Sequence, residues 1–346
     1  MKEPSAIKTS LFAAQEREEK LNRKGDLLQE LNQHVNFAAL AVEIDRTAPR
    51  PDKKHGGRPP YPTELMVRVL VLQHLYGLSD DAMEYQLLDR LSFQRFCGLR
   101  HSASIPDAKT LWVFRERLRE TGDSDVLFDA VQHQLQSRGY LARGGQIIDA
   151  TLVAAPKQHI SQRDKALLEA DATPADWTPA QRRQKDRDAS WTKKHGRRHH
   201  GYKLSINADK KYKLIRKKQV STAKVHDTNH FETILDPLNT RLEIWADKGY
   251  QDAEREQRLT KAGWRLNIQR KAKRGKPQSS CQKRRNTRIA RPRARVEHIF
   301  GSMTAMGVFC IRSIGLARAE LNLSIKSAVY NMRRLCSLKK AGIEPF

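Results

Sequence analysis

Residues 144–156 read GGQIIDATLVAAP, an apolar and β-branched run bounded by glycine and proline. This composition is typical of a buried β-strand. The middle of the run holds one acid, Asp149. A buried carboxylate without a partner costs on the order of a few kcal/mol or takes up a proton, so Asp149 needs a cation or a donor beside it. A structural partner, such as an arginine or a backbone amide, and a functional site both satisfy that need.

Later segments predict the rest of an α/β layer. Residues 201–227 alternate apolar and polar side chains on both sides of a turn at Asp209, which predicts a β-hairpin. Residues 241–254 predict an apolar strand that stops at Asp247, then a turn and a helix, and residues 264–270 predict a further strand. A long amphipathic helix near the C-terminus should pack on this sheet. The polar segment at about 156–195 is expected to be a partly helical insertion.

The N-terminal third predicts helices only. Residues 1–55 are charged and helix-prone and end in a Pro/Gly-rich cluster, which indicates a helical arm and a linker. Within residues 56–125, one buried helix should end at Gly77, Ser79 should cap a second and Asp107 a third. Three short helices with tight turns resemble a helix-turn-helix DNA reader, although many helical domains that bind no DNA share the pattern. A mixed α/β domain is expected over residues 140–338.

The charge of the chain points to a polyanionic partner. Lys and Arg number 65 against 39 Asp and Glu, a formal net charge of +26. Such an excess is expected of a protein that neutralises phosphates, although a basic structural or ribosome-associated protein would share it. Residues 270–295 hold twelve of these cations and no acid. A solvated loop is one interpretation of that run, and a surface that tracks DNA phosphates is the one that its density favours.

Other sequence features limit the class of protein. No apolar run approaches the roughly 18 residues that span a bilayer, and the first residues lack a signal-peptide core, so a soluble cytoplasmic protein is expected. The 4 cysteines lie far apart, without the spacing of a zinc site or a disulfide framework.

Two more acids stand in unusual positions. Asp247 ends its predicted strand at the edge where ligands gather in α/β sheets, although Asp-Lys-Gly also makes a good turn. Glu297 lies in RARVEHIFG, residues 293–301, where Pro292 suits the first turn of a helix. Glu297 then lies at the edge of an apolar stripe that should pack on the sheet and can lean toward Asp149 and Asp247. Alternatively, Arg293 and Glu297 form an exposed ion pair worth about 0.3–0.5 kcal/mol.

Three convergent carboxylates suit phosphoryl transfer. Acids on adjacent strands can offset their mutual repulsion by binding divalent metal ions. Two such ions activate a water or a 3′-hydroxyl and stabilise the leaving oxygen. Oxygen ligands favour Mg²⁺, or Mn²⁺, over zinc.

Five segments in this order resemble a known family. They are IIDATLVAAP, HGYKLSINAD, TAKVHDTNHF, WADKGY and RARVEHIFG. Their order and spacing are similar to the DDE transposases of the bacterial insertion-sequence-five family, related to the insertion-sequence-four group. The helical segments at residues 57–118 look like the N-terminal domain of that family, and the resemblance covers roughly residues 57–335.

This resemblance implies an RNase H-like catalytic domain, a mixed β-sheet flanked by helices. It implies that Asp149, Asp247 and Glu297 hold two Mg²⁺ or Mn²⁺ ions. In the family signature Y-x2-R-x3-E-x6-K, Arg293 and Glu297 match, whereas Ala290 and Thr304 replace the tyrosine and the lysine.

The resemblance also implies accessory positions and DNA contacts. Tyr250, His226 and Asp227 match family positions, and a loop hydrogen bond is an equally good interpretation of His226. The expected DNA-binding residues are Lys203, Arg284, Arg285, Arg291, Arg293 and Arg295.

The function that follows is metal-dependent cleavage of double-stranded DNA at the terminal inverted repeats of an insertion sequence, then strand transfer into target DNA. A homo-oligomer on DNA, at the bacterial nucleoid, is implied with it. An RNase H-like nuclease that does not join DNA, and a domesticated DNA-binding protein, are the alternatives.

Overall fold

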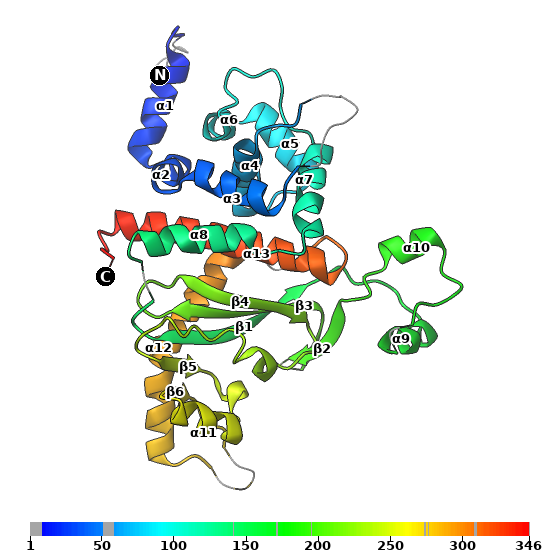
Figure 1. Ribbon diagram of the computed structural model, residues 1–346, viewed down its shortest axis with the longest axis vertical. Coiled ribbons are helices and arrows are strands. Elements are labelled where there is room, and N and C mark those ends of the chain that lie inside the picture. Colours follow the sequence, from blue (N-terminus) through cyan, green and yellow to red (C-terminus); the bar gives the residue numbers. More distant parts are fainter. Residues whose placement is uncertain are drawn as a thin grey trace, which may run out of the picture.

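The computed structural model describes residues 9–50, 59–140, 142–170, 172–194, 196–272, 275, 277–307 and 310–345. Its first part is helical (Figure 1). The helices are α1 (Ala13–Lys24), α2 (Leu27–His34), α3 (Phe37–Thr47), α4 (Thr63–Tyr76), α5 (Asp80–Asp89), α6 (Leu91–Cys97), α7 (Ala108–Glu120) and α8 (Val126–Ser137).

The predicted helix boundaries in this region are confirmed. Gly77 adopts a left-handed conformation directly after α4. The side chains of Ser79 and Asp107 accept hydrogen bonds from the first turns of α5 and α7. The core of the expected linker, residues 51–58, lies outside the described residues.

A mixed sheet forms the second part. Its strands are β1 (Gln146–Ala154), β2 (Ser190–Lys194), β3 (Arg197–Asp209), β4 (Ile215–Thr222), β5 (Glu243–Ala246) and β6 (Arg265–Ile268). β3 pairs antiparallel with β1, β2 and β4, while β1, β5 and β6 run parallel. The predicted hairpin is therefore β3–β4, and the polar insertion leaves the sheet between β1 and β2 with two short helices, α9 (Gln162–Glu169) and α10 (Pro179–Gln184).

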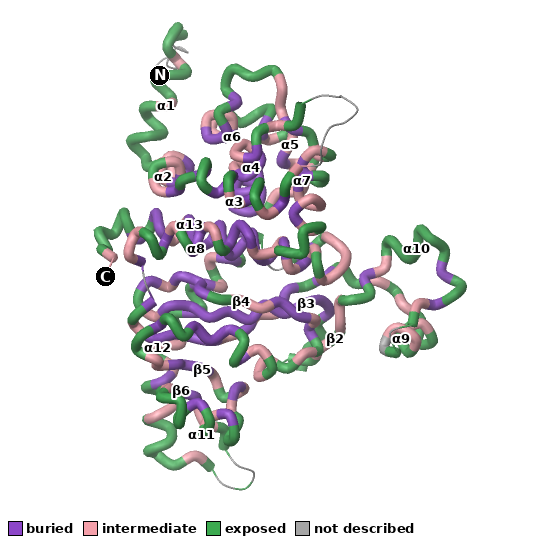
Figure 2. Tube along the Cα trace, viewed as in Figure 1, coloured by how far each residue is buried: buried purple, intermediate pink, exposed green. Residues whose placement is uncertain are grey.

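Helices cover the sheet on the side of the N-terminal region. α13 (Leu316–Lys340) lies between the sheet and the N-terminal helices, where it contacts β4, α2, α4 and α8. The expectation that this helix packs on the sheet is confirmed. It is more deeply buried than an amphipathic surface helix, as the purple colour along it in Figure 2 shows, because elements pack on two sides of it.

A smaller apolar cluster lies apart from this main core. It joins Ile148 of β1 to Phe231, Tyr250 and the short helix α11 (Ala253–Lys261). Two 3₁₀ turns border it, η1 (Asp227–His230) and η2 (Lys248–Tyr250). Apolar side chains thus pack against both faces of the sheet, which fixes the positions of β1 and β5 and of the side chains that they carry.

The helix that carries the basic run starts earlier than the sequence predicts. α12 (Ser280–Ala305) begins with a capping box between Ser279 and Gln282, so Pro292 lies inside the helix and the prediction that it occupies the first turn is wrong. Serine followed by glutamine three residues later is a strong helix start, and it outweighs the cost of an interior proline. α12 packs on β1 and β5 through Ile289, Val296, Ile299 and Met303.

Candidate active site

Strand register brings Asp149 and Asp247 to the same level of the sheet. β1 and β5 are parallel, and Ile147 pairs with Trp245. Asp149 lies two residues after Ile147, and Asp247 lies two residues after Trp245. Because side chains alternate along a strand, both acids project from the face of the sheet that holds Ile147 and Trp245. The negative charge of Asp247 is close enough to raise the pKa of Asp149. The two strand acids therefore converge, as the sequence predicts.

The carboxylate of Asp247 is positioned by the turn that follows β5. Asp247 is the N-cap of η2, and its Oδ1 accepts a 2.6 Å hydrogen bond from the backbone N–H of Gly249. A Cβ at position 249 would lie 2.8 Å from that same oxygen. Glycine is therefore needed here for space around the carboxylate, and the expected Asp-Lys-Gly turn and the expected acidic position coincide.

Asp149 is held by an arginine from α12. Nη2 of Arg293 donates to Oδ2 of Asp149 over 2.7 Å, and the backbone N–H of Ala150 donates to Oδ1 over 2.8 Å. Burial raises the pKa of Asp149, the positive charge and hydrogen bond of Arg293 lower it, and the net change is a rise. Both side chains of the ion pair are largely buried, with 17% of Arg293 and 16% of Asp149 exposed. Arg293 thus supplies a cation at the point where the two acids meet.

Glu297 lies one turn after Arg293 on α12, and its side chain is exposed. Within the described residues, no group of three or more His, Cys, Asp or Glu side chains could hold a metal ion. The structure therefore brings together two of the three predicted carboxylates and leaves Glu297 at the surface. The single positive charge of Arg293 balances only one of the two carboxylates, so repulsion opposes a third carboxylate at this point.

Tyr250 ends η2, three residues after Asp247, and is buried in the apolar cluster that contains Ile148. Its ring is 1% exposed and packs against Phe231 at 5.6 Å between ring centroids. Burial, followed by the charges of Asp149, Asp227 and Asp247, raises the pKa of Tyr250 well above its ordinary value. Its buried hydroxyl has no hydrogen-bond partner among the described residues. The hydroxyl therefore stays protonated, with its donor unused.

The other accessory positions form a second charged group near η1. Asp227 Oδ1 lies 2.5 Å from Nζ of Lys203, which also donates to the carbonyl of Val225. Lys203 pairs with Leu152 of β1, so strand alternation places it on the face opposite to Asp149. The imidazole of His226 caps η1 through Thr228, which is the loop hydrogen bond that the sequence allows.

Family models assign the chain. The model described as "Transposase DDE domain" matches residues 141–332, and "Transposase domain (DUF772)" matches residues 15–117. The chain belongs to the DDE transposase family. Its helical N-terminal region and mixed sheet with flanking helices confirm the predicted RNase H-like fold class of such transposases. Enzymes of this kind process DNA and generally use divalent metal ions.

A solved structure is also similar to this transposase. It is the cryo-EM structure of a piggyBac transposase synaptic complex with hairpin DNA. The match covers 93% of this chain and 77% of that chain, with 11% sequence identity and a TM-score of 0.48.

The predicted DNA-binding residues of the transposase fall into two groups. Arg285 donates to the carbonyl of Ile268 and Arg295 to that of Lys210. Arg284 and Arg291 are exposed on α12, with no ion pair or hydrogen bond in the described part of the chain. The side chains of the second group thus have no partner in the described residues, whereas Arg285, Arg293, Arg295 and Lys203 already have partners within the fold.

Arg255 of α11 is a site residue that the sequence did not indicate. Its guanidinium lies 4.5 Å from the Phe231 ring centroid and donates to the carbonyls of Thr228 and Tyr250. One side chain thereby joins η1 to η2. No local pattern marks this arginine, because its partners lie in turns that only the tertiary structure brings together.

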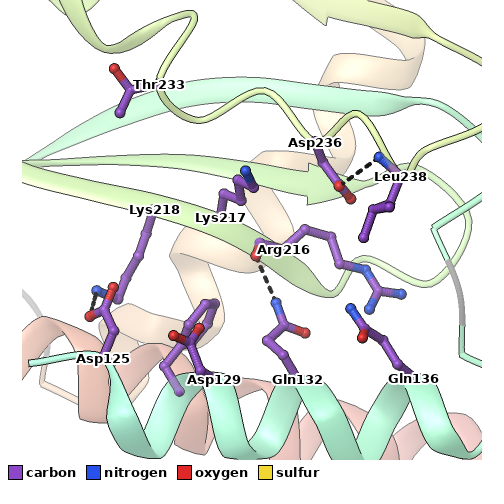
Figure 3. Close-up of a pocket in the computed structure, with 11 residues that line it drawn as sticks. Asp125, Asp129, Gln132, Gln136, Arg216, Lys217, Lys218, Thr233, Asp236 and Leu238 are labelled. Atoms are coloured by element: carbon purple, nitrogen blue, oxygen red, sulfur yellow. Dashed lines mark hydrogen bonds and ion pairs between the residues drawn. The ribbon is translucent and has the colours of Figure 1, made fainter. Parts of the chain in front are cut away.

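A cavity of about 320 Å³ lies apart from the acids, between α8, β4 and residues 233–238 (Figure 3). Gln132 projects from α8 and donates to the carbonyls of Ile215 and Arg216 on the edge strand β4. Lys218 points toward Asp125 and pairs with it. Gln132 thus satisfies two buried carbonyls of an edge strand and the ion pair joins α8 to the same strand, so the cavity belongs to the packing of the sheet edge.

Among the described residues, no helix has the length and hydropathy that a membrane crossing requires.

Proposed function

We propose that this transposase cleaves double-stranded DNA at the terminal inverted repeats of an insertion sequence and joins the 3′-hydroxyl ends to target DNA. Asp149, Asp247 and Glu297 are the proposed metal ligands. The observation that carries the proposal is the placement of Asp149 and Asp247 at one level of the sheet, with a guanidinium on Asp149. A cation is needed between these acids, and Arg293 meets that need within the chain.

The donor set fits hard divalent cations. Two carboxylates from adjacent strands provide oxygen ligands of the kind that Mg²⁺ and Mn²⁺ prefer. When bound, two such ions would supply the positive charge that offsets charge developing on the phosphoryl oxygens. Arg293 then has to release Asp149, and Glu297 has to turn inward from its exposed position on the same helix. Arg293 and Glu297 lie one helical turn apart on α12, so both changes occur at the same part of this helix.

The chain's own residues divide the remaining tasks. Arg293, released from Asp149, can bind a phosphate of the DNA through its planar set of donors. Arg284 and Arg291, seven residues apart, lie on one exposed face of α12, on the opposite side of the helix from Arg293, where they can position the DNA backbone. Tyr250 is buried in the apolar cluster next to the acids, and its hydroxyl is a hydrogen-bond donor without a partner in the described residues.

The partners follow from the same proposal. Substrates are the element ends and target DNA, bound by a homo-oligomer at the nucleoid of a bacterial cytoplasm. The motifs that resemble the insertion-sequence-five family support these partners.

Cleavage and joining of end-containing DNA in the presence of Mg²⁺ test the proposal. Asp149→Asn, Asp247→Asn and Glu297→Gln should each abolish both steps. Glu254→Gln is the matched control, because Glu254 is an exposed acid of α11 in the same domain. Wild-type rates in all three site variants would disprove the metal site, and cleavage without joined products would favour a nuclease.

A further inference from the structure

A strongly basic β-ribbon extends one end of the sheet. It consists of β2 and the first residues of β3, residues 190–194 and 197–201, and is called the basic ribbon below. In Figure 1 it lies at the end of the sheet nearest α9 and α10. Its exposed cations are Lys193, Lys194, Arg197 and Arg198.

The register of the basic ribbon sets like charges directly opposite each other. Lys193 pairs with Arg198, and Lys194 pairs with Arg197. Like charges in directly opposed positions destabilise an antiparallel ladder. In the described part of the chain, no acid forms an ion pair with any of these four side chains. The ribbon therefore carries repulsion that nothing in the described fold offsets.

One face of the basic ribbon also presents an aromatic ring. Trp191 is 43% exposed, and its ring contacts that of His200 in a tilted arrangement, with 5.0 Å between centroids. Strand alternation places Trp191 on the same face as Lys193 and Arg198, while Lys194 and Arg197 occupy the other face. Both faces are thus cationic. A single lysine would protect an edge strand from pairing with another chain, and it would do so without two opposed cation pairs.

We propose that the basic ribbon is a second DNA-binding element that grips the backbone of duplex DNA away from the carboxylates. This inference rests on the proposed function. A polyanion relieves the repulsion between opposed cations, and a two-stranded ribbon with both faces charged fits between the two phosphate chains that line a major groove.

The distance along β3 indicates which part of the DNA the ribbon contacts. Ile206 pairs with Asp149, and β3 runs as one strand from Arg197 to Asp209. The strand rises roughly 30 Å from Arg197 to Ile206. At about 3.4 Å per nucleotide of one strand, that length equals roughly nine base pairs. The ribbon therefore holds DNA about one helical turn from the phosphodiester at the carboxylates.

The salt dependence of DNA binding tests this proposal. The full chain is titrated with a duplex of about 30 base pairs, roughly three helical turns, at several salt concentrations and without divalent metal. The variant is Lys194→Gln/Arg197→Gln. The matched control is Lys20→Gln/Arg23→Gln, which removes two exposed cations from α1 at the far end of the molecule. The thermal midpoint of each variant is measured alongside.

The ribbon variant should lose about two from the slope of log K against log salt, and the control variant should keep the wild-type slope. The thermal midpoint of the ribbon variant should be unchanged or higher, because the repulsion between Lys194 and Arg197 has been removed. Weaker DNA binding by this variant would then not result from misfolding. An unchanged slope, or an equal loss in the control, would overturn the proposal. The titration is done without metal, so it measures DNA binding separately from cleavage and joining. If the chain binds DNA through the ribbon but neither cuts nor joins DNA in the presence of Mg²⁺, the proposed function fails and the ribbon proposal stands.

Discussion

Nη2 of Arg293 lies 2.7 Å from Oδ2 of Asp149, although 144 residues separate the two in sequence. The contact joins the middle of α12 to the middle of β1. It places a guanidinium at the position where a divalent cation is proposed to bind. Four predictions follow from this arrangement and its surroundings.

Removal of Arg293 should destabilise the fold in a pH-dependent way. Burial holds the pKa of Asp149 above its ordinary value, and Arg293 opposes that rise. A raised carboxyl pKa means that the folded chain binds the proton more tightly than the unfolded chain. The stability contributed by the protonated form is therefore lost as pH increases from the ordinary pKa through the folded one. Without Arg293 the folded pKa is higher, so this loss deepens and extends to higher pH.

Urea denaturation of Arg293→Gln measures the effect. The loss should be about 2 kcal/mol near pH 7, the cost of one hydrogen bond between charged groups, and smaller near pH 4. Arg291→Gln, an exposed arginine on the same helix, should change stability by less than about 0.5 kcal/mol. An equal loss at both pH values would show that Arg293 stabilises the fold through packing alone.

Divalent metal should stabilise the wild-type chain and not its site variants. A ligand that binds only the folded state at 100 times its Kd adds about 2.7 kcal/mol to the free energy of unfolding. Mg²⁺ or Mn²⁺ should therefore raise the thermal midpoint of the wild type and of Glu254→Gln. The rise should disappear in Asp149→Asn and Asp247→Asn. A metal-dependent rise that survives both substitutions would place the metal elsewhere.

Gly249→Ala should impair the site without unfolding the chain. The new Cβ would meet Oδ1 of Asp247 at 2.8 Å, and the carboxylate is the group that can move. Changes to the residues that orient a metal-binding side chain typically reduce metal affinity about 10–100-fold. Gly301→Ala on α12 is the control, since a Cβ there meets nothing within 4 Å and alanine favours a helix. Equal metal affinity in the two variants would contradict the prediction.

Two tyrosines should respond in opposite ways to loss of their hydroxyls. Tyr250 has a buried hydroxyl without a partner in the described residues, so Tyr250→Phe should leave the free energy of unfolding unchanged or raise it by up to about 1 kcal/mol. The hydroxyl of Tyr202 donates to Asp186 at 2.7–2.8 Å. Tyr202→Phe should therefore cost about 1.5–3 kcal/mol. Calorimetry on both variants measures the difference, and a comparable loss in both would mean that Tyr250 has a donor or acceptor partner in solution.

Local chemistry made much of the fold predictable. Ser79 and Asp107 start helices because their side chains satisfy free backbone N–H groups, and Gly77 ends one because it tolerates a left-handed backbone. Sequence reasoning failed at Pro292, because a capping box at Ser279 and Gln282 starts the helix well upstream of the proline. The proline rule describes a cost of about 3 kcal/mol, and a long packed helix can absorb that cost.

The sequence alone determined the acids, the order of the strands and the excess of positive charge, because residue type, periodicity and spacing are properties of the chain itself. Only the tertiary structure decided that Arg293 forms an ion pair with Asp149, that Glu297 remains exposed and that Arg255 donates hydrogen bonds to both η1 and η2. Each of these contacts joins segments far apart in sequence. Their strength depends on distance and burial, which local patterns do not encode.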